Sequence, residues 1–269
     1  MKLVCVGDVN LDYYTNMKKK FLGGISLNFA VNAKELGADV SIVSCIGDYQ
    51  GRYKNIKQIL SNLRINTERL HVKHGKTPEQ NIKIIDDGSR KFIGYTEGVL
   101  KNFKLNKGDI KFIKSHDVVI VPFSEGTIRL FKQIMALDYN ITRISDFSED
   151  SKYGIPFKII EKHIYNLDII FIGGNERIIP KASFLSKKYK KLIVITLGKK
   201  GSLAILDGKK TFYPTRPIKA IDTTGCGDAF QAAFTISYLV DKKILRALKA
   251  GTKQALKVAK HFGGTKYEI

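Results

Sequence analysis

The chain has 269 residues, 43% of them hydrophobic and 26% charged, as in an ordinary globular protein, and no apolar run is long enough for a membrane span or a signal peptide. We therefore expect a cytoplasmic protein with no membrane partner. The formal net charge of +21 would suit nucleic-acid binding, but the lysines recur along the whole length without a helix-turn-helix or RNA-binding pattern, so we expect a solvated basic surface and no nucleic-acid partner.

The first hundred residues predict alternating strands and helices, followed by an interruption. Apolar runs predict strands at 3–6 and 40–45, and apolar periodicity predicts helices after them, at about 25–36 and 52–63. Three extended segments then follow, at 70–73, 80–85 and 91–95, with a hairpin turn at 86–90. We interpret them, with the polar segment near the start, as a small β lid formed by residues of about 12–23 and 70–100, which would cover a ligand and exclude water.

The rest of the chain returns to the alternation. Strands are expected at 118–121, 142–146, 167–172, 191–196, 202–206 and 210–213, the last two forming a hairpin, and helices at 107–114, 125–136, 157–163, 229–240 and 243–261. Strands that alternate with helices form a parallel sheet covered on both faces. We therefore predict one doubly wound α/β domain over residues 1–269 with a small inserted β lid.

The stretch from Ile221 to Phe230 combines glycines, an acid and the start of a helix. Gly225 and Gly227 allow a sharp turn, and amide groups at a helix start bind phosphate oxygens and stabilise charge in phosphoryl transfer. Asp228 could then accept a proton from an attacking hydroxyl. The alternative is a glycine turn with Asp228 as a helix cap, and the stretch by itself fits both.

Polar residues also follow the first strand. Asp8 and Asp12 lie just beyond its carboxyl end, where open α/β sheets bind ligands, and Gly23-Gly24 and Asn28 begin the next helix. Such side chains can bond sugar hydroxyls, although a glycine-capped turn explains the same residues. Neither a P-loop nor a complete dinucleotide-binding glycine motif is present in the sequence, and the three cysteines have no CxxC spacing, which argues against a zinc site.

The pair of motifs, Gly23-Gly24 with Asn28 and the run from Asp222 to Asp228, resembles the two signatures of the ribokinase-like PfkB carbohydrate kinase family. The resemblance spans nearly the whole chain. It implies a ribokinase-like three-layer α/β/α kinase domain and ATP-dependent phosphorylation of a sugar, with ATP and Mg²⁺ as cofactors. The need for a monovalent cation is left open.

Residue by residue, the resemblance implies three groups of contacts. The catalytic group is Asp228 as the base with Gly225, Cys226 and Gly227 as the anion hole. The sugar contacts are Asp12, Gly24 and Asn28, with Asp8 as a further candidate. The nucleotide contacts are Asn175, Thr196, Gly198, Gly201, Gly251 and Gln254. The family commonly has alanine in place of Cys226, and an Asn-x-x-Glu metal motif in which this chain has Ile178 instead of the acid. Either Glu176 holds the magnesium, or ATP phosphates and water do.

Within the family, residues 73–77, 95–99 and 146–148 resemble the fructoselysine 6-kinase branch. This resemblance implies 6-phosphorylation of a fructosamine, with Arg90, Tyr95 and Glu97 of the lid reading its amino-acid part. The same three residues could instead belong to the hairpin or to a homodimer interface through the lid. The alternative functions are a fructokinase-like or nucleoside-kinase-like member, and a basic nucleic-acid-binding protein on an inactive kinase scaffold.

Overall fold

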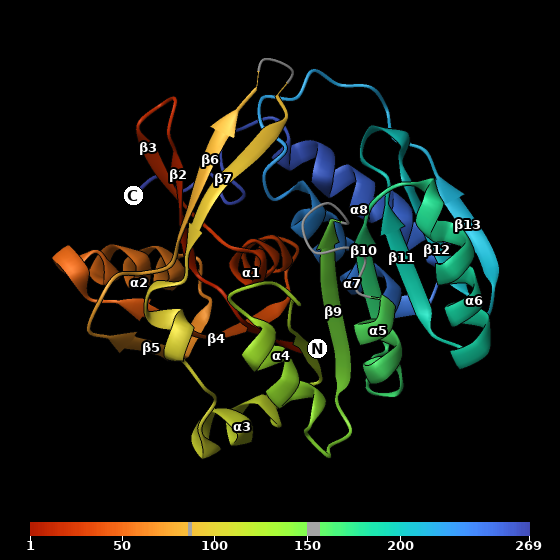
Figure 1. The fold of residues 1–269 in the computed structure, drawn as a ribbon, viewed down its shortest axis with the longest axis horizontal. Helices are drawn as coiled ribbons and strands as arrows, with labels where there is room; N and C mark the ends of the chain where they lie inside the picture. Colours follow the sequence, from red (N-terminus) through yellow and green to blue (C-terminus); the bar gives the residue numbers. More distant parts are fainter. Residues whose placement is uncertain (86–87, 150–156) are drawn as a thin grey trace.

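The computed structural model describes residues 1–85, 88–149 and 157–269, and within them a nine-stranded sheet forms the centre of the molecule (Figure 1). Its strands, from one edge to the other, are β13 (Lys209–Tyr213), β12 (Ser202–Leu206), β11 (Leu192–Thr196), β10 (Ile169–Gly173), β9 (Thr142–Glu149), β8 (Val118–Ile120), β1 (Lys2–Val6), β4 (Asp39–Gly47) and β5 (Asn66–Lys73). Neighbours from β11 to β5 are parallel, while β12 and β13 pair antiparallel. The carboxyl ends of the parallel strands therefore meet at one edge.

Helices cover both faces of this sheet. On one face lie α1 (Ile25–Glu35), α2 (Tyr53–Asn62), α7 (Cys226–Asp241) and α8 (Ile244–Val258); on the other lie α3 (Lys107–Ile113), α4 (Ile128–Met135), α5 (Phe157–His163) and α6 (Ile179–Tyr189). Successive residues of β1 divide between two apolar cores, with Leu3 and Cys5 in one and Val4 and Val6 in the other, because side chains alternate along a strand. The predicted three-layer α/β/α arrangement is confirmed. None of the described helices is long and apolar enough to cross a membrane.

A separate four-stranded sheet contains most of the predicted lid segments, and we call this sheet the lid. Its order is β3 (Lys19–Gly23), β2 (Asn10–Tyr14), β6 (Glu79–Ile84) and β7 (Arg90–Thr96). It has a small core of its own, formed by Tyr14, Phe21 and Ile82. Two residues of the predicted hairpin turn, 86 and 87, lie outside the described part of the chain.

The second lid segment begins at β6, later in the chain than the predicted range of 70–100. Strand β5, which contains the predicted segment 70–73, pairs in parallel with β4 at the edge of the main sheet, for example Leu70 with Ser44. An edge strand is half exposed, as β5 is along most of its length, and so is a lid strand. Local sequence therefore did not distinguish them.

Candidate active site

The loop formed by residues 222–227, which we call the anion loop, leads directly into α7. Gly225 is the N-cap and has a φ of 75°, in the left-handed region that favours glycine, and a Cβ on it would lie 2.4 Å from the Cα of Gly264. A Cβ on Gly227 would meet no atom of the described residues within 4 Å, so the helix start is open on that side. Within the described chain, no side chain caps α7. The amide of Cys226 donates to the carbonyl of Thr223 at 3.3 Å and is partly satisfied inside the loop.

Asp228 lies in the first turn of α7 and is 9% exposed. The Nδ2 of Asn28, on α1, donates to its Oδ2 at 2.8 Å, which joins two predicted site residues 200 positions apart. Burial, and after it the negative charge of Asp146, raises the pKa of Asp228 to about 8. A carboxylate with a pKa near the working pH is suited to general base catalysis.

The other predicted carboxylates lie close to this pair. Asp12, on β2, is buried, and its pKa is raised well above its ordinary value by burial and by the charges of Asp8 and Asp228. Asp8 has a structural role: its carboxylate accepts from the amides of Ile25 and Ser26, at 3.0 and 2.9 Å, and so caps the start of α1.

Buried polar atoms without partners mark the same region. In the described residues these include the Oδ1 atoms of Asn10 and Asn28 and the Oγ1 of Thr224. Buried polar groups in native proteins are nearly always paired, so a ligand rich in hydroxyl groups would fit here. A Cβ on Gly24 would lie 3.0 Å from Asp8, so this edge of the site has room only for the backbone of a glycine. Sequence reasoning missed Asn10 and Asp146 as site residues, although both follow the carboxyl end of a strand or lie near it, which was the available signal.

The three predicted lid residues divide between two places. The Nη1 of Arg90 donates to both the carbonyl and the Oγ1 of Thr223, at 3.0 Å each, so its guanidinium group is engaged by the anion loop. Tyr95 is largely buried, and its pKa is raised by burial and by the charges of Asp8 and Glu97. Tyr95 therefore lies near Asp8 and Asp12, two predicted sugar contacts, with Glu97 close to it.

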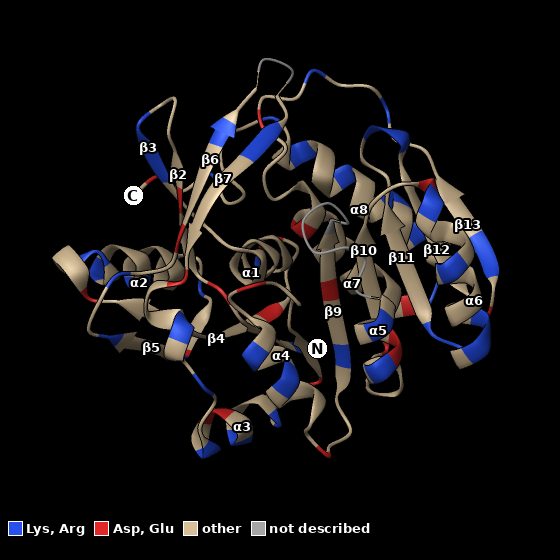
Figure 2. Ribbon diagram, viewed as in Figure 1, with Lys and Arg blue, Asp and Glu red and all other residues tan. Residues whose placement is uncertain are grey.

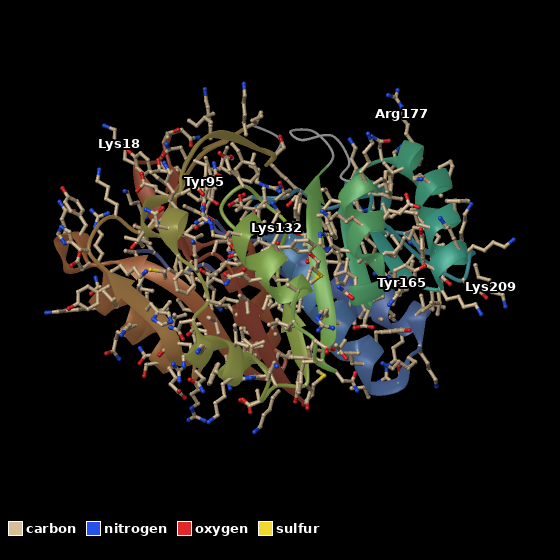
Figure 3. All side chains as sticks on the ribbon, turned by 60° about the horizontal axis from the view of Figure 1, so that its bottom comes forward. Lys18, Tyr95, Lys132, Tyr165, Arg177 and Lys209 are labelled. Carbon is tan, nitrogen blue, oxygen red and sulfur yellow. The ribbon has the colours of Figure 1, made fainter. Side chains whose placement is uncertain are left out.

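The predicted nucleotide contacts of two loops come together at the ends of β10 and β11. The amide of Gly174 donates to the carbonyl of Thr196 at 3.1 Å, and the Nζ of Lys200, between Gly198 and Gly201, lies 2.6 Å from Glu176. The Oδ1 of Asn175 accepts from the amide of Arg177 at 2.9 Å. In Figure 3 the labelled Tyr95 and Arg177 both lie toward the edge where β9 ends, on opposite sides of it. The acceptor and nucleotide candidates thus flank one edge of the sheet.

Gly251 and Gln254 take part in helix packing. A Cβ on Gly251 would lie 2.6 Å from the ring of Phe230, so this glycine lets α8 approach α7. The Nε2 of Gln254 donates to the Oδ1 of Asn32 on α1 at 2.8 Å, and both side chains are buried. Their contact with the adenine stays a prediction.

The described residues hold no cluster of three or more His, Cys, Asp or Glu side chains that could bind a metal ion. Glu176, the predicted magnesium ligand, is exposed and forms an ion pair with Lys200. Magnesium in nucleotide sites usually keeps several waters and binds the substrate phosphates with one or two carboxylates. The residues present therefore fit an ion held mainly by ATP and water, with Glu176 as an added ligand.

Comparison with known proteins gives a consistent result. The model of the pfkB family carbohydrate kinases matches residues 1–127 and 167–268. The chain is 27% identical to the fructoselysine 6-kinase of Escherichia coli K12, over 97% of this chain and 98% of that protein, and 24% identical to the fructosamine kinase FrlD of Bacillus subtilis, over 99% and 94%. The crystal structure of the Methanocaldococcus jannaschii nucleoside kinase, of the ribokinase family, superposes with a TM-score of 0.77 at 23% identity, over 99% of this chain and 94% of that one. This similarity confirms the predicted ribokinase-like fold.

Proposed function

The chain belongs to the pfkB family of carbohydrate kinases and is an ATP-dependent sugar kinase, and we propose that its acceptor is a fructosamine such as fructoselysine, phosphorylated on the 6-hydroxyl group. Two of the relatives that match over nearly the whole chain are named for fructoselysine and fructosamine, which supports this acceptor class. A nucleoside kinase and a fructokinase also match, at 25% and 24% identity over 88% and 86% of this chain, and supply the alternative acceptors.

The observation that carries the chemistry is the buried pair of Asn28 and Asp228 beside unpaired polar oxygens. A sugar bound there would donate hydroxyl groups to the free Oδ1 atoms of Asn10 and Asn28, and its primary hydroxyl would give its proton to Asp228. The amides of Gly225 and Gly227, at the positive end of the α7 dipole, would stabilise the charge on the phosphoryl group in transfer. Asp12 would complete the sugar contacts.

ATP would lie along the loops after β10 and β11, between Asn175 and Gly201. Magnesium, when bound with ATP, neutralises part of the polyphosphate charge, and Glu176 would hold it. Glu176 would then exchange its ion pair with Lys200 for the metal. Whether a monovalent cation is required is tested by varying its concentration in the assay.

Specificity for a fructosamine requires a group that binds the positively charged amino-acid part. Glu97 is half-buried at the end of β7, on the lid, close enough to Tyr95 for its charge to raise the pKa of that tyrosine. We assign Glu97 to this role, and we assign Tyr95 to packing against the part of the substrate that joins the sugar to its amino-acid group. Arg90, which is bonded to Thr223, is reassigned from the acceptor to the anion loop.

A panel of acceptors tests the proposal. ATP-dependent phosphorylation of fructoselysine, fructose, ribose, inosine and cytidine would be compared by kcat/KM. We expect fructoselysine to be preferred over free fructose by a large factor, because a site built to bond a polar group rejects an analogue lacking it by about 10⁴-fold in favourable cases. If fructose or a nucleoside is the better acceptor, the fructosamine assignment fails and only the sugar-kinase activity stands.

The variant Glu97→Ala locates this preference. It should lower kcat/KM for fructoselysine by about 10- to 100-fold, the loss of a bond to a charged group, and leave turnover of fructose nearly unchanged. Glu68→Ala, on the exposed edge strand β5, is the matched control and should change neither. Equal losses with both sugars would remove Glu97 from the recognition of the amine.

A further inference from the structure

The lid bonds directly to the residues that shape the anion loop. The hydroxyl of Tyr14, on lid strand β2, donates to the Oδ2 of Asp222 at 2.5 Å, across 208 positions of sequence. Both side chains are fully buried. Burial and the charge of Asp222 raise the pKa of Tyr14, so the hydroxyl keeps its proton and acts as the donor.

Asp222 passes this contact on to the loop. Its Oδ1 accepts from the amide of Thr224 at 2.8 Å, and its Oδ2 accepts also from the amide of Gly263 at 2.9 Å. The carboxylate therefore holds the residue just before Gly225 in place. Without the bond from Tyr14, one oxygen of a buried carboxylate would lose its hydroxyl donor, and hydrogen bonds to charged groups are the stronger ones.

A second lid strand reaches the neighbouring residue. The Nη1 of Arg90, on β7, donates to the carbonyl and Oγ1 of Thr223, and the amide of Thr223 donates to the carbonyl of Gly88 at 3.1 Å. The carbonyl of Thr223 also accepts from the amide of Cys226, the first residue of α7. One acceptor is thus shared between the lid and the start of the helix.

We propose that Tyr14 and Arg90 are positioning residues for phosphoryl transfer, which hold the anion loop in the shape that its amides need to bind the transferring phosphoryl group. This inference rests on the proposed function. The same lid sheet carries Asp12 and Tyr95, and Glu97 follows its strand β7 directly, so the strands proposed to contact the acceptor also set the geometry of the loop. Removing either contact should weaken transition-state stabilisation, whereas ATP keeps its contacts on the loops after β10 and β11.

The variants Tyr14→Phe and Arg90→Gln test the proposal. The first removes the hydroxyl donor, the second replaces the guanidinium group with a shorter, neutral amide, and both keep most of the side-chain volume. We expect kcat to fall about 10- to 100-fold, as for the loss of a hydrogen bond to a charged or shared group, with KM for ATP within about twofold of wild type. The matched controls are the next residues on the same strands. Tyr13→Phe, whose ring contacts Lys20, and Lys91→Gln, which is exposed, should leave both constants unchanged.

Amide hydrogen exchange supplies a readout that does not depend on activity. In the protein without substrates, a peptide covering residues 222–228 should exchange faster in Tyr14→Phe and Arg90→Gln than in wild type and in the two controls. If Tyr14→Phe does not fold, Arg90→Gln carries the test on its own.

The outcomes separate this proposal from the proposed function. Unchanged exchange of residues 222–228 in both variants, or a rise in KM for ATP with kcat intact, overturns the positioning role. If the wild-type protein phosphorylates none of the acceptors but exchange in the loop rises in the variants, the proposed function fails and the link between lid and loop stands.

Discussion

At the scale of single residues, the site depends on one buried carboxyl group whose environment opposes its charge. Asp228 lies among Asp8, Asp12 and Asp146, and Asn28 is its one side-chain donor among the described residues. Its pKa is raised to about 8 chiefly by burial. The carboxylate of Asp228 therefore accepts a proton more readily than an ordinary aspartate. Such an arrangement costs stability and is typical of catalytic positions.

The first prediction is that Asp228→Asn abolishes turnover. The amide has the same size and can still accept the bond from Asn28, but it cannot take the proton of the attacking hydroxyl. We expect kcat to fall by at least about 10³-fold while the dissociation constant for ATP, measured by calorimetry, stays within about threefold. Turnover near that of the wild type would exclude Asp228 as the base.

The pH dependence of activity follows from the raised pKa. Only the ionised carboxylate of Asp228 can act as the base, so log kcat/KM should rise with a slope of about one up to roughly pH 8 and level off above it. A profile that is flat from pH 6 to 9 would contradict the prediction.

Stability should follow the opposite course. The carboxyl group binds its proton more tightly in the folded chain, with a pKa of about 8, than in the unfolded chain, near 3.8, so its contribution to stability falls as pH rises from about 4 to about 8. Asp228→Asn should therefore raise the Tm at pH 9 by about 2 °C or more, and by much less at pH 5. A lower Tm at pH 9 would show that the charge is compensated.

Cys226 is expected to act through its backbone alone. Burial raises the pKa of its thiol to about 12, so the thiolate is scarce at neutral pH. Cys226→Ala should thus keep kcat within about twofold and abolish any sensitivity of the anion loop to thiol reagents. Complete loss of activity would indicate thiol chemistry.

At the scale of elements, the position of α7 depends on how closely α8 can approach it. Gly251 lies against the ring of Phe230, which stacks on Phe234 in the same core. Phe230 comes only two residues after Asp228, the proposed base. A side chain here must displace an aromatic ring or the helix backbone. Both would shift the start of α7 and its amides.

Gly251→Ala should for this reason be destabilising although alanine is the better helix former. Overpacking costs about 1–3 kcal/mol, and we expect the Tm to fall by a few degrees for a chain of this length. Lys249→Ala, an exposed change on the same helix, is the control and should leave the Tm nearly constant. An increase in Tm for Gly251→Ala would show that Phe230 moves aside without cost.

At the scale of the whole molecule, the positive charge is spread over the surface. Figure 2 shows Lys and Arg on the lid strands, on α3 to α6 and on β13, with few acidic residues between them. Such a charge keeps a protein soluble and favours anionic ligands. The lid adds an apolar feature, since Ile85, Phe92 and Ile93 are about half exposed, at 46%, 50% and 49%.

We expect the lid to form a homodimer interface through these residues. Neighbouring exposed apolar side chains on a sheet mark interaction surfaces, and twofold pairing would bury them against each other. Light scattering after gel filtration should give twice the mass of 30.2 kDa, and Phe92→Lys should shift the protein to the monomer. Phe212→Lys, at an equally exposed phenylalanine on β13, should not. A monomeric wild type at micromolar concentration would contradict the prediction.

The sequence by itself determined the order of strands and helices, the doubly wound sheet and the loop that begins α7, because alternation, apolar periodicity and glycine turns act over a few neighbouring residues. Only the tertiary structure decided which distant groups meet. The bonds from Asn28 to Asp228 and from Tyr14 to Asp222 join residues about 200 positions apart, and no local pattern specifies such partners. The same reason explains why β5 was assigned to the lid. Pairing of an edge strand and engagement of Arg90 by Thr223 depend on the fold around them, which brings the lid and the anion loop together.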